Sequence, residues 1–236
     1  MADRGNAEIM WLGHSTFRLR TPGGRTIVVD PWVEQNPACP QDLKSFDRLD
    51  AMLVTHGHFD HIADAVALGV KHAPQTVCIF ETSVWLEGKG VKTCVGMNKG
   101  GTVEVAGVKV TMVHADHSCG ILDDGKIIYG GDPCGYVIEL ENGYRIYHAG
   151  DTNVFGDMKL IAELYRPDMA MIPIGGHYTM GPREAAYACR LLGAKEIVPM
   201  HFGTFPVLAG TPSMLRDLTR EIPGLVVHDP RPGTRV

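Results

Sequence analysis

The sequence is poor in cysteine, and its six cysteines include no C-x-x-C pair. Irregular spacing in a chain without a recognisable export signal is typical of reduced, buried thiols rather than of a disulfide framework. A structural zinc site is usually closed by four ligands dominated by cysteine, and this pattern does not favour one. The cysteines are Cys39, Cys78, Cys94, Cys119, Cys134 and Cys189.

Long apolar runs and clusters of basic residues are also missing. No apolar run approaches the roughly 18 residues that a membrane span needs. The first residues, MADRGNAEIMWLGHS, lack the basic region and apolar core of a signal peptide. We therefore expect no membrane span and a cytoplasmic location. The net charge of -5 and the absence of a Lys/Arg-rich run disfavour a nucleic-acid partner, although a local basic groove stays open.

Familiar nucleophile and phosphate-loop motifs are absent as well. None of G-x-S-x-G, G-x-x-x-x-G-K-[ST] or G-x-G-x-x-G occurs. What the chain does have is the composition of a globular protein, with 236 residues, 44% hydrophobic and 21% charged. No linker interrupts it, and the densest Pro/Gly stretch, residues 229–233, is interpreted as a tail. We expect a single domain over residues 1–236, and a homo-oligomer is compatible with this composition.

Short runs rich in Val, Ile and Met alternate with polar turns, and helical spacing appears between some of them. Strands come first and helices interleave later, which favours sheets with helices packed outside. The predicted strands are 8–12, 15–20, 26–30, 51–55, 77–80, 102–105, 108–114, 126–129, 136–140, 144–148, 169–174 and 196–200. The predicted helices are 60–68, 157–165, 183–192 and 213–221.

The segment THGHFDHIAD, residues 55–64, holds an H-x-H-x-D-H pattern. Composition alone predicts only about 0.002 such matches in this chain, so coincidence explains it poorly. Residues two apart in an extended segment point to the same side, and His56 and His58 can therefore converge on one point. Asp60 and His61 follow where a helix should begin. Adjacent residues there project in different directions, so this short segment can reach two neighbouring metal positions. Mixed imidazole and carboxylate ligands are typical of hydrolytic zinc sites.

Three later segments place a ligand type shortly after a predicted strand. They are HADHS with His117, HAGDT with Asp151, and PMHFGTF with His201. Loops at strand ends are where functional sites are usually assembled. We therefore expect these residues to complete the metal site. His114 is an alternative to His117, because both lie in VHADHS.

Taken together, these motifs resemble the metallo-β-lactamase fold hydrolases. WLGHSTF, the Asp30-Pro31 pair, HAGDT and PIGGHYTMGP are similar to the subgroup of small metal-dependent hydrolases that includes the ascorbate-phosphate lactonase. The resemblance covers nearly the whole chain. It implies an α+β fold, an αββα sandwich of two mixed sheets with helices on the outer faces, which agrees with the pattern of predicted elements.

The resemblance also implies a role for each ligand type. It places His117 rather than His114 at the first metal, because His117 precedes the small residue Ser118. It makes Asp30 a brace for the histidine loop, and it implies that His14 and His177 line the substrate pocket. A structural role for either of these two histidines stays open. The implied ligands are His56, His58 and His117 for one metal, Asp60, His61 and His201 for the other, and Asp151 as the bridge.

Two divalent ions sharing a water would give a metal-bridged hydroxide that attacks an ester, lactone or phosphodiester of a small-molecule substrate. Asp60 or Asp151 would orient this nucleophile. Zinc is the favoured metal, with manganese, nickel or iron as alternatives. Other functions stay open, because one fold hosts many reactions. They are an iron-dependent oxygenase or other redox enzyme, and a metal-dependent nuclease.

Overall fold

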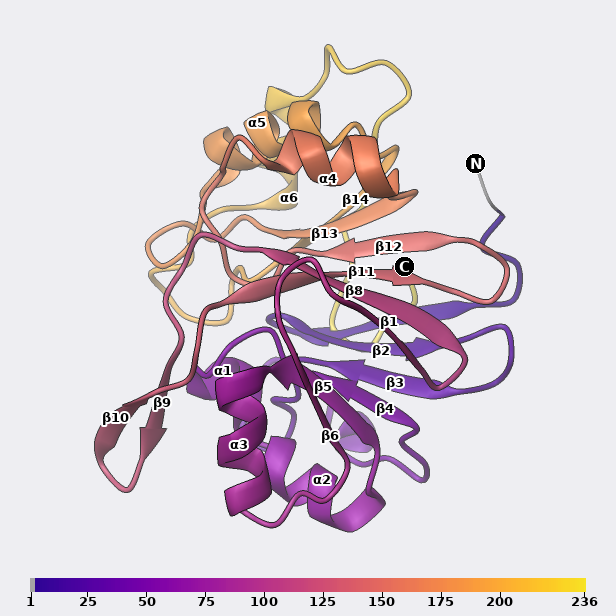
Figure 1. The fold of residues 1–236 in the computed structure, drawn as a ribbon. Helices are drawn as coiled ribbons and strands as arrows, with labels where there is room; N and C mark the ends of the chain where they lie inside the picture. The colour runs from indigo at the N-terminus through magenta and orange to yellow at the C-terminus, as the bar shows by residue number, and fades with distance from the viewer. Residues whose placement is uncertain (1–2) are drawn as a thin grey trace.

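The computed structural model describes residues 3–236, in which two sheets lie face to face and helices cover both outer faces (Figure 1). This is the αββα sandwich of mixed sheets that the sequence predicted. The helices beside the first sheet are α1 (Phe59–Ile62), α2 (Ala65–His72) and α3 (Phe80–Gly88). Those over the second sheet are α4 (Met158–Tyr165), α5 (Pro182–Leu192) and α6 (Pro212–Leu218). None of these described helices is long and apolar enough to cross a membrane.

The first sheet follows chain order from one edge to the other. Its first three strands are antiparallel neighbours, and the remaining strands continue in parallel. A 3-10 turn, η1 (Gln41–Leu43), lies in the long connection that precedes the fourth strand. The strands are β1 (Glu8–Gly13), β2 (Thr16–Arg20), β3 (Thr26–Val29), β4 (Ala51–Leu53), β5 (Gln75–Ile79) and β6 (Cys94–Met97).

The second sheet has the order β15-β14-β13-β12-β11-β8-β7. Its four C-terminal strands run parallel to one another, and the others are antiparallel neighbours. The strands are β7 (Thr102–Val105), β8 (Val108–His114), β11 (Cys134–Glu139), β12 (Arg145–His148), β13 (Met169–Pro173), β14 (Glu196–Met200) and β15 (Val226–Val227). Two more strands, β9 (Gly120–Asp123) and β10 (Lys126–Tyr129), pair only with each other among residues 3–236.

The two sheets share a core because strands of both contribute apolar side chains to the space between them. In β2, Phe17 and Leu19 are buried between the sheets while the intervening arginines face outward. Val110 and Met112 of β8 enter the same core from the second sheet. Burial of this apolar area is the main favourable contribution to folding. The sheets are thereby fixed against each other, and the loops at one end of them are brought together.

Most predicted elements are present, with two differences that affect the site. The helix predicted over 60–68 divides into α1 and α2, and Asp64 lies between them because its carboxylate accepts hydrogen bonds from the backbone amides of Val33 and Glu34. The strand predicted over 77–80 ends at Ile79, and α3, which the sequence did not predict, begins at Phe80. Strands β6, β9 and β15 were also not predicted.

Candidate metal centre

The loop after β4 brings the first ligand types into place. His56 and His58 follow the strand two residues apart, and α1 begins immediately after His58. The glycine between them, Gly57, is required by packing, because a Cβ there would overlap the side chain of Ile121. Its amide donates a hydrogen bond to the sulfur of Cys119 at 3.3 Å. The loop is therefore held from one side by backbone contacts and presents its imidazoles to the other.

A group of three imidazoles forms at this loop. The Nε2 atom of His56 lies 3.0 Å from Nδ1 of His58, and Nε2 of His117 lies 3.3 Å from the same atom. One ring nitrogen of each of these residues lies within 4.8 Å of the others. His114, the alternative to His117, is exposed and packs its ring edge against Phe155. The structure thus brings His117, and not His114, to the H-x-H pair.

A second group lies on the α1 side of the loop. The Oδ2 atom of Asp60 is 3.9 Å from Nε2 of His61 and 3.6 Å from Nε2 of His201. His201 follows β14, and its backbone has a positive φ of 54° that turns the chain sharply at the end of the strand. His14 completes the group, with Nε2 at 2.8 Å from Asp60 Oδ2. Four potential ligands therefore meet at this point.

Asp151 lies between the two groups. Its Oδ2 atom is 3.0 Å from Nε2 of His201 and 3.3 Å from Nε2 of His61. The same oxygen is 3.7 Å from Nε2 of His117 and 4.0 Å from Nε2 of His56. One carboxylate oxygen thus faces imidazole nitrogens from both groups, which is where a bridging ligand would lie.

The donor set of the centre fits divalent transition-metal ions. Among residues 3–236, several buried polar atoms here have no hydrogen-bond partner: Nε2 of His61, both ring nitrogens of His201 and Oδ1 of Asp151. Buried polar atoms are normally paired, so such a group of unpaired atoms requires an explanation. Imidazole and carboxylate donors at this spacing suit zinc and its neighbours in the first transition row.

Asp30 contacts the histidine loop through both of its carboxylate oxygens. Its Oδ1 atom accepts a hydrogen bond from the backbone N–H of Thr55, and Oδ2 accepts one from the Thr55 hydroxyl, both at 2.8 Å. Oδ2 also lies 2.8 Å from Nδ1 of His61. A proton on Nδ1 of His61 leaves the lone pair of Nε2 facing the centre. Carboxylates that accept a hydrogen bond from the other ring nitrogen, as Asp30 does here, commonly orient a ligating histidine.

The two expected pocket histidines lie in different places. His14 is fully buried under Asp60, and Nδ1 of His14 lies 3.0 Å from the Thr204 hydroxyl. Burial lowers the pKa of His14 to about 4, so its neutral ring donates from Nε2 to Asp60 and accepts from Thr204. His177 is exposed, and its ring packs edge-on against Tyr178, with centroids 4.4 Å apart. It is Tyr178 that lines the hollow over the centre.

The ionisable groups at the centre shift one another's pKa values. Burial opposes ionisation of Asp151, but His201 and His61 hold its pKa well below the usual range. Burial likewise opposes a charge on His201, yet Asp151 and Asp60 raise its pKa to about 9. The group therefore attracts cations strongly, and a metal ion would compete with the imidazole protons for the same nitrogens.

A hollow of about 540 Å³ opens above this centre. Four of its lining residues are apolar or aromatic side chains that the sequence did not single out, because an exposed apolar residue carries no motif. The signal that could have found them is the Asp124-Gly125 turn between two apolar runs, which is typical of a hairpin. The lining residues are His58, Phe59, Asp60, His117, Ser118, Gly120, Leu122, Ile127, Asp151, Tyr178 and His201.

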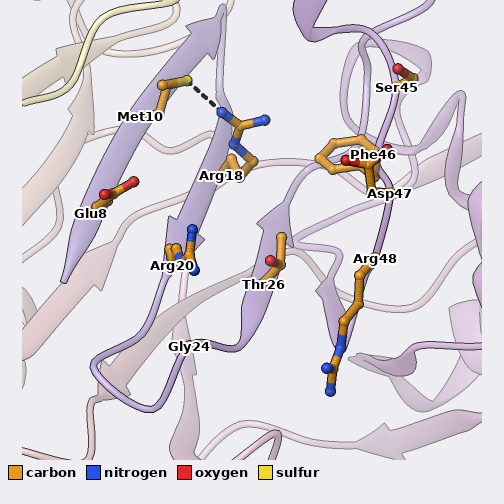
Figure 2. A pocket seen from close by; sticks show the side chains of 10 residues that line it. All are labelled: Glu8, Met10, Arg18, Arg20, Gly24, Thr26, Ser45, Phe46, Asp47 and Arg48. Carbon is orange, nitrogen blue, oxygen red and sulfur yellow. Dashed lines mark hydrogen bonds between the residues drawn. The ribbon is translucent and has the colours of Figure 1, made fainter.

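A second hollow, of about 460 Å³, lies on the outward face of the first three strands (Figure 2). Arg18 and Arg20 point into it, and the guanidinium of Arg18 lies 3.0 Å from the sulfur of Met10. Arg48 at its rim pairs with Asp50. None of the residues 3–236 that line it is a histidine or cysteine, whereas three histidines and two aspartates line the hollow above the metal centre.

Comparison with known proteins identifies the family. Residues 25–202 match the model of the β-lactamase superfamily domain. The chain is 57% identical over 226 residues to a UPF0173 metal-dependent hydrolase of Koribacter versatilis, with 96% of each chain covered. The chain belongs to the UPF0173 metal-dependent hydrolases. A UPF0173 hydrolase of Rubrobacter xylanophilus is 50% identical over 231 residues, with 97% of this chain and 96% of the relative covered.

Solved structures show the fold of this hydrolase directly. Igni18, a metallo hydrolase from Ignicoccus hospitalis, superimposes with a TM-score of 0.85 at 34% identity and covers 98% of this chain and 97% of its own. CmlA, a diiron β-hydroxylase from Streptomyces venezuelae, has a TM-score of 0.73 at 14% identity, covering 93% of this chain and 52% of CmlA. The likeness to CmlA concerns the fold alone. The metallo-β-lactamase fold and the metal-dependent hydrolase family inferred from the motifs are both confirmed.

Proposed function

We propose that this UPF0173 protein is a dinuclear hydrolase, with zinc as the favoured metal, that acts on an ester, lactone or phosphodiester of a small molecule. The observation that carries the proposal is the position of Asp151, whose Oδ2 lies within 4.0 Å of imidazole nitrogens from both ligand groups. Manganese, nickel and iron suit the same donors. The similarity to the lactonase subgroup stays a prediction about the substrate.

The chain's own residues divide between holding the ions and orienting the reactants. His56, His58 and His117 would hold one ion, and Asp60, His61 and His201 the other, with Asp151 shared. When bound, the ions would lower the pKa of water toward neutrality and polarise the substrate's oxygen. Asp60 is positioned to orient the attacking water, because His14 fixes one of its oxygens at 2.8 Å.

Water is the expected nucleophile because the nearest thiol is unsuited to the role. Cys119 is buried, and its sulfur donates to the carbonyl of Gly130 while accepting from the Gly57 amide. Burial raises the pKa of this thiol above its ordinary value. A thiolate is the reactive form of cysteine, so the side chain acts as packing beside the metal loop.

The alternative to hydrolysis is iron-dependent oxygen chemistry, because CmlA, which shares the fold, is a diiron β-hydroxylase. A panel of activated esters, lactones and phosphodiesters, assayed with zinc-, manganese- and iron-loaded protein beside an oxygen electrode, separates the two. We expect metal-dependent hydrolysis without oxygen uptake. Oxygen consumption confined to the iron-loaded form, with no hydrolysis in any form, would replace the proposal with the oxygenase.

Metal content provides a separate test. Elemental analysis of protein purified without chelator should give about two transition-metal ions per chain. A His56→Ala, His58→Ala variant should lose at least one of them, because it removes two of three ligands at one position. Content well below one ion after metal supplementation, or unchanged content in the variant, would refute the dinuclear assignment.

A further inference from the structure

The hairpin β9–β10 is a separate two-stranded unit that projects from the body of the protein (Figure 1), and two of its side chains line the hollow above the metal centre. It follows directly after His117 and Ser118, so the chain passes from a metal ligand into the hairpin. Asp124 and Gly125 form its turn with φ of 47° and 76°, the backbone that a two-residue hairpin of this type requires. Its position is thus set by the same segment that supplies the third histidine.

The two faces of the hairpin have opposite environments. Ile121 is buried against Gly57 of the metal loop and anchors one face. On the other face, Leu122 and Ile127 are register partners, and directly opposite residues of an antiparallel pair project to the same side. Their side chains are 64% and 79% exposed, and both line the hollow above the centre. Large apolar groups are therefore left open to water beside the site.

Two further apolar side chains extend this surface to the metal ligands. Phe59, between His58 and Asp60 in the chain, is 56% exposed, and Tyr178 is 60% exposed. Both line the same hollow. We call Phe59, Leu122, Ile127 and Tyr178 the apolar wall. In the described part of the chain, no lysine or arginine lines this hollow, so it offers no side-chain cation for a phosphate or other anion.

The wall is held in place rather than loosely attached. Asp123 at the end of β9 accepts a hydrogen bond from the indole N–H of Trp85 at 2.9 Å and one from the Lys89 ammonium at 2.7 Å. Both donors lie on or beside α3, the helix packed against the edge of the first sheet. These hydrogen bonds therefore attach the hairpin to the body of the protein at Asp123, one residue away from Leu122.

We propose that the apolar wall binds an apolar acyl or aryl group of the substrate, so that the enzyme hydrolyses uncharged carboxylic esters or lactones with such a group in preference to phosphodiesters. This inference rests on the proposed hydrolase function. A reacting carbonyl placed at Asp60 and Asp151 has its substituents in the same hollow, because the metal centre is part of the lining. The volume of about 540 Å³ suits a small molecule.

The test is a chain-length series of p-nitrophenyl esters, from acetate to octanoate, with zinc-loaded protein. Burial of one methylene corresponds to about a fourfold gain at full burial, and an open wall should give about twofold or more per methylene. We expect kcat/KM to rise by that factor along the series until the hollow is filled. The phosphodiester bis(p-nitrophenyl) phosphate should be a poorer substrate than the octanoate.

A double variant, Leu122→Ser with Ile127→Ser, should flatten this dependence of kcat/KM on chain length. The matched control is Leu164→Ser, which removes a 70% exposed leucine from α4, on the opposite outer face of the sandwich. Metal content and melting temperature should stay at wild-type values in both variants. Calorimetric titration gives a second readout. The wild-type protein should bind octanoate more tightly than acetate, whereas the double variant should bind both with equally low affinity.

The outcomes separate this inference from the function on which it rests. Absence of hydrolysis of every ester and phosphodiester by the metal-loaded protein would refute the proposed function. Hydrolysis with kcat/KM independent of chain length, or a profile that the double variant does not change, would refute the apolar wall alone. A variant that loses self-association while keeping the wild-type profile would show that the wall is an interface between copies of the chain.

Discussion

Asp151 contributes one carboxylate to two groups of imidazoles, so a single substitution there should lower both metal content and activity. Asp151→Asn keeps the shape of the side chain but removes the negative charge that offsets repulsion between two cations about 3.5–4 Å apart. We expect metal content to fall from about two ions to about one, held by the neutral His56, His58 and His117, and activity to fall by orders of magnitude.

Elemental analysis and the rate of ester hydrolysis check this prediction. Asp157→Asn, which neutralises an exposed carboxylate beside α4, is the control and should behave as wild type. The account of the bridge fails if Asp151→Asn binds both ions with wild-type affinity and turns over normally.

Asp30 allows a second test at the residue scale, because it sets the proton position of His61. Asp30→Asn places an amide where Oδ2 lies 2.8 Å from Nδ1 of His61. An NH₂ group there would donate to Nδ1, leaving the proton on Nε2 directed at the metal position. We expect the affinity for the second ion to fall by about 10- to 100-fold. Competition with a chromogenic chelator measures this, and an unchanged affinity would show that Asp30 only supports the backbone.

The cluster of potential ligand residues could be predicted from the sequence because metal chemistry restricts residue type and spacing together. His56, His58 and His61 form a dense local pattern, and the structure brings His117 and His201 to it from distant loops. The surroundings of the ligands were harder to predict. Whether a lone histidine such as His14 lies under Asp60 or lines a pocket depends on burial that no local pattern encodes.

At the scale of elements, the turn after β13 packs directly against the turn after β14. A Cβ added to Gly175 would overlap the carbonyl oxygen of His201, which is backbone and has little room to move. Gly175→Ala should therefore displace His201, weaken the second metal position and lower activity by about tenfold or more, as misplacement of supporting groups by 1 Å commonly does.

Gly156→Ala is the matched control for this prediction, because a Cβ there meets nothing within 4 Å and no unusual backbone angle is required. Metal titration and a crystal structure of the Gly175 variant measure the displacement. Wild-type metal affinity in Gly175→Ala would show that the turn adapts without moving His201.

Two elements that the sequence did not predict, α3 and β9, lack a regular apolar pattern. The apolar residues of α3 do not form one consistent face, and its buried side chains include the polar Thr82 and Ser83. β9 contains only four residues and, within the residues that the structure describes, pairs with no strand of the main sheets. Strong periodicity arises where an apolar face packs against the core, as in β8, and neither α3 nor β9 has a regular apolar face.

At the scale of the whole molecule, the metal centre joins loops from both sheets, so metal binding should stabilise the fold. A ligand at 100 times its Kd adds about 2.7 kcal/mol to the free energy of unfolding when only the native state binds it. For a chain of this length, that corresponds to a rise in melting temperature of roughly 5–10 °C. Calorimetry of chelator-treated and zinc-loaded protein measures the shift, and equal melting temperatures would contradict it.

The shared core between the sheets also supports the expectation of a single domain over residues 1–236. Phe17 of one sheet and Met112 of the other belong to one cluster of buried residues. In a single domain, loss of the metal and unfolding of the sheets should be coupled. The calorimetric trace of the zinc-loaded protein is therefore expected to show one transition.

The central claim is that this chain holds two metal ions with Asp151 between them. Anomalous scattering from zinc-loaded crystals, measured at the zinc absorption edge, tests it most directly. We expect two peaks about 3.5–4 Å apart, one beside His56, His58 and His117 and the other beside Asp60, His61 and His201. A single peak in the presence of excess zinc, or peaks ligated by other residues, would contradict the account.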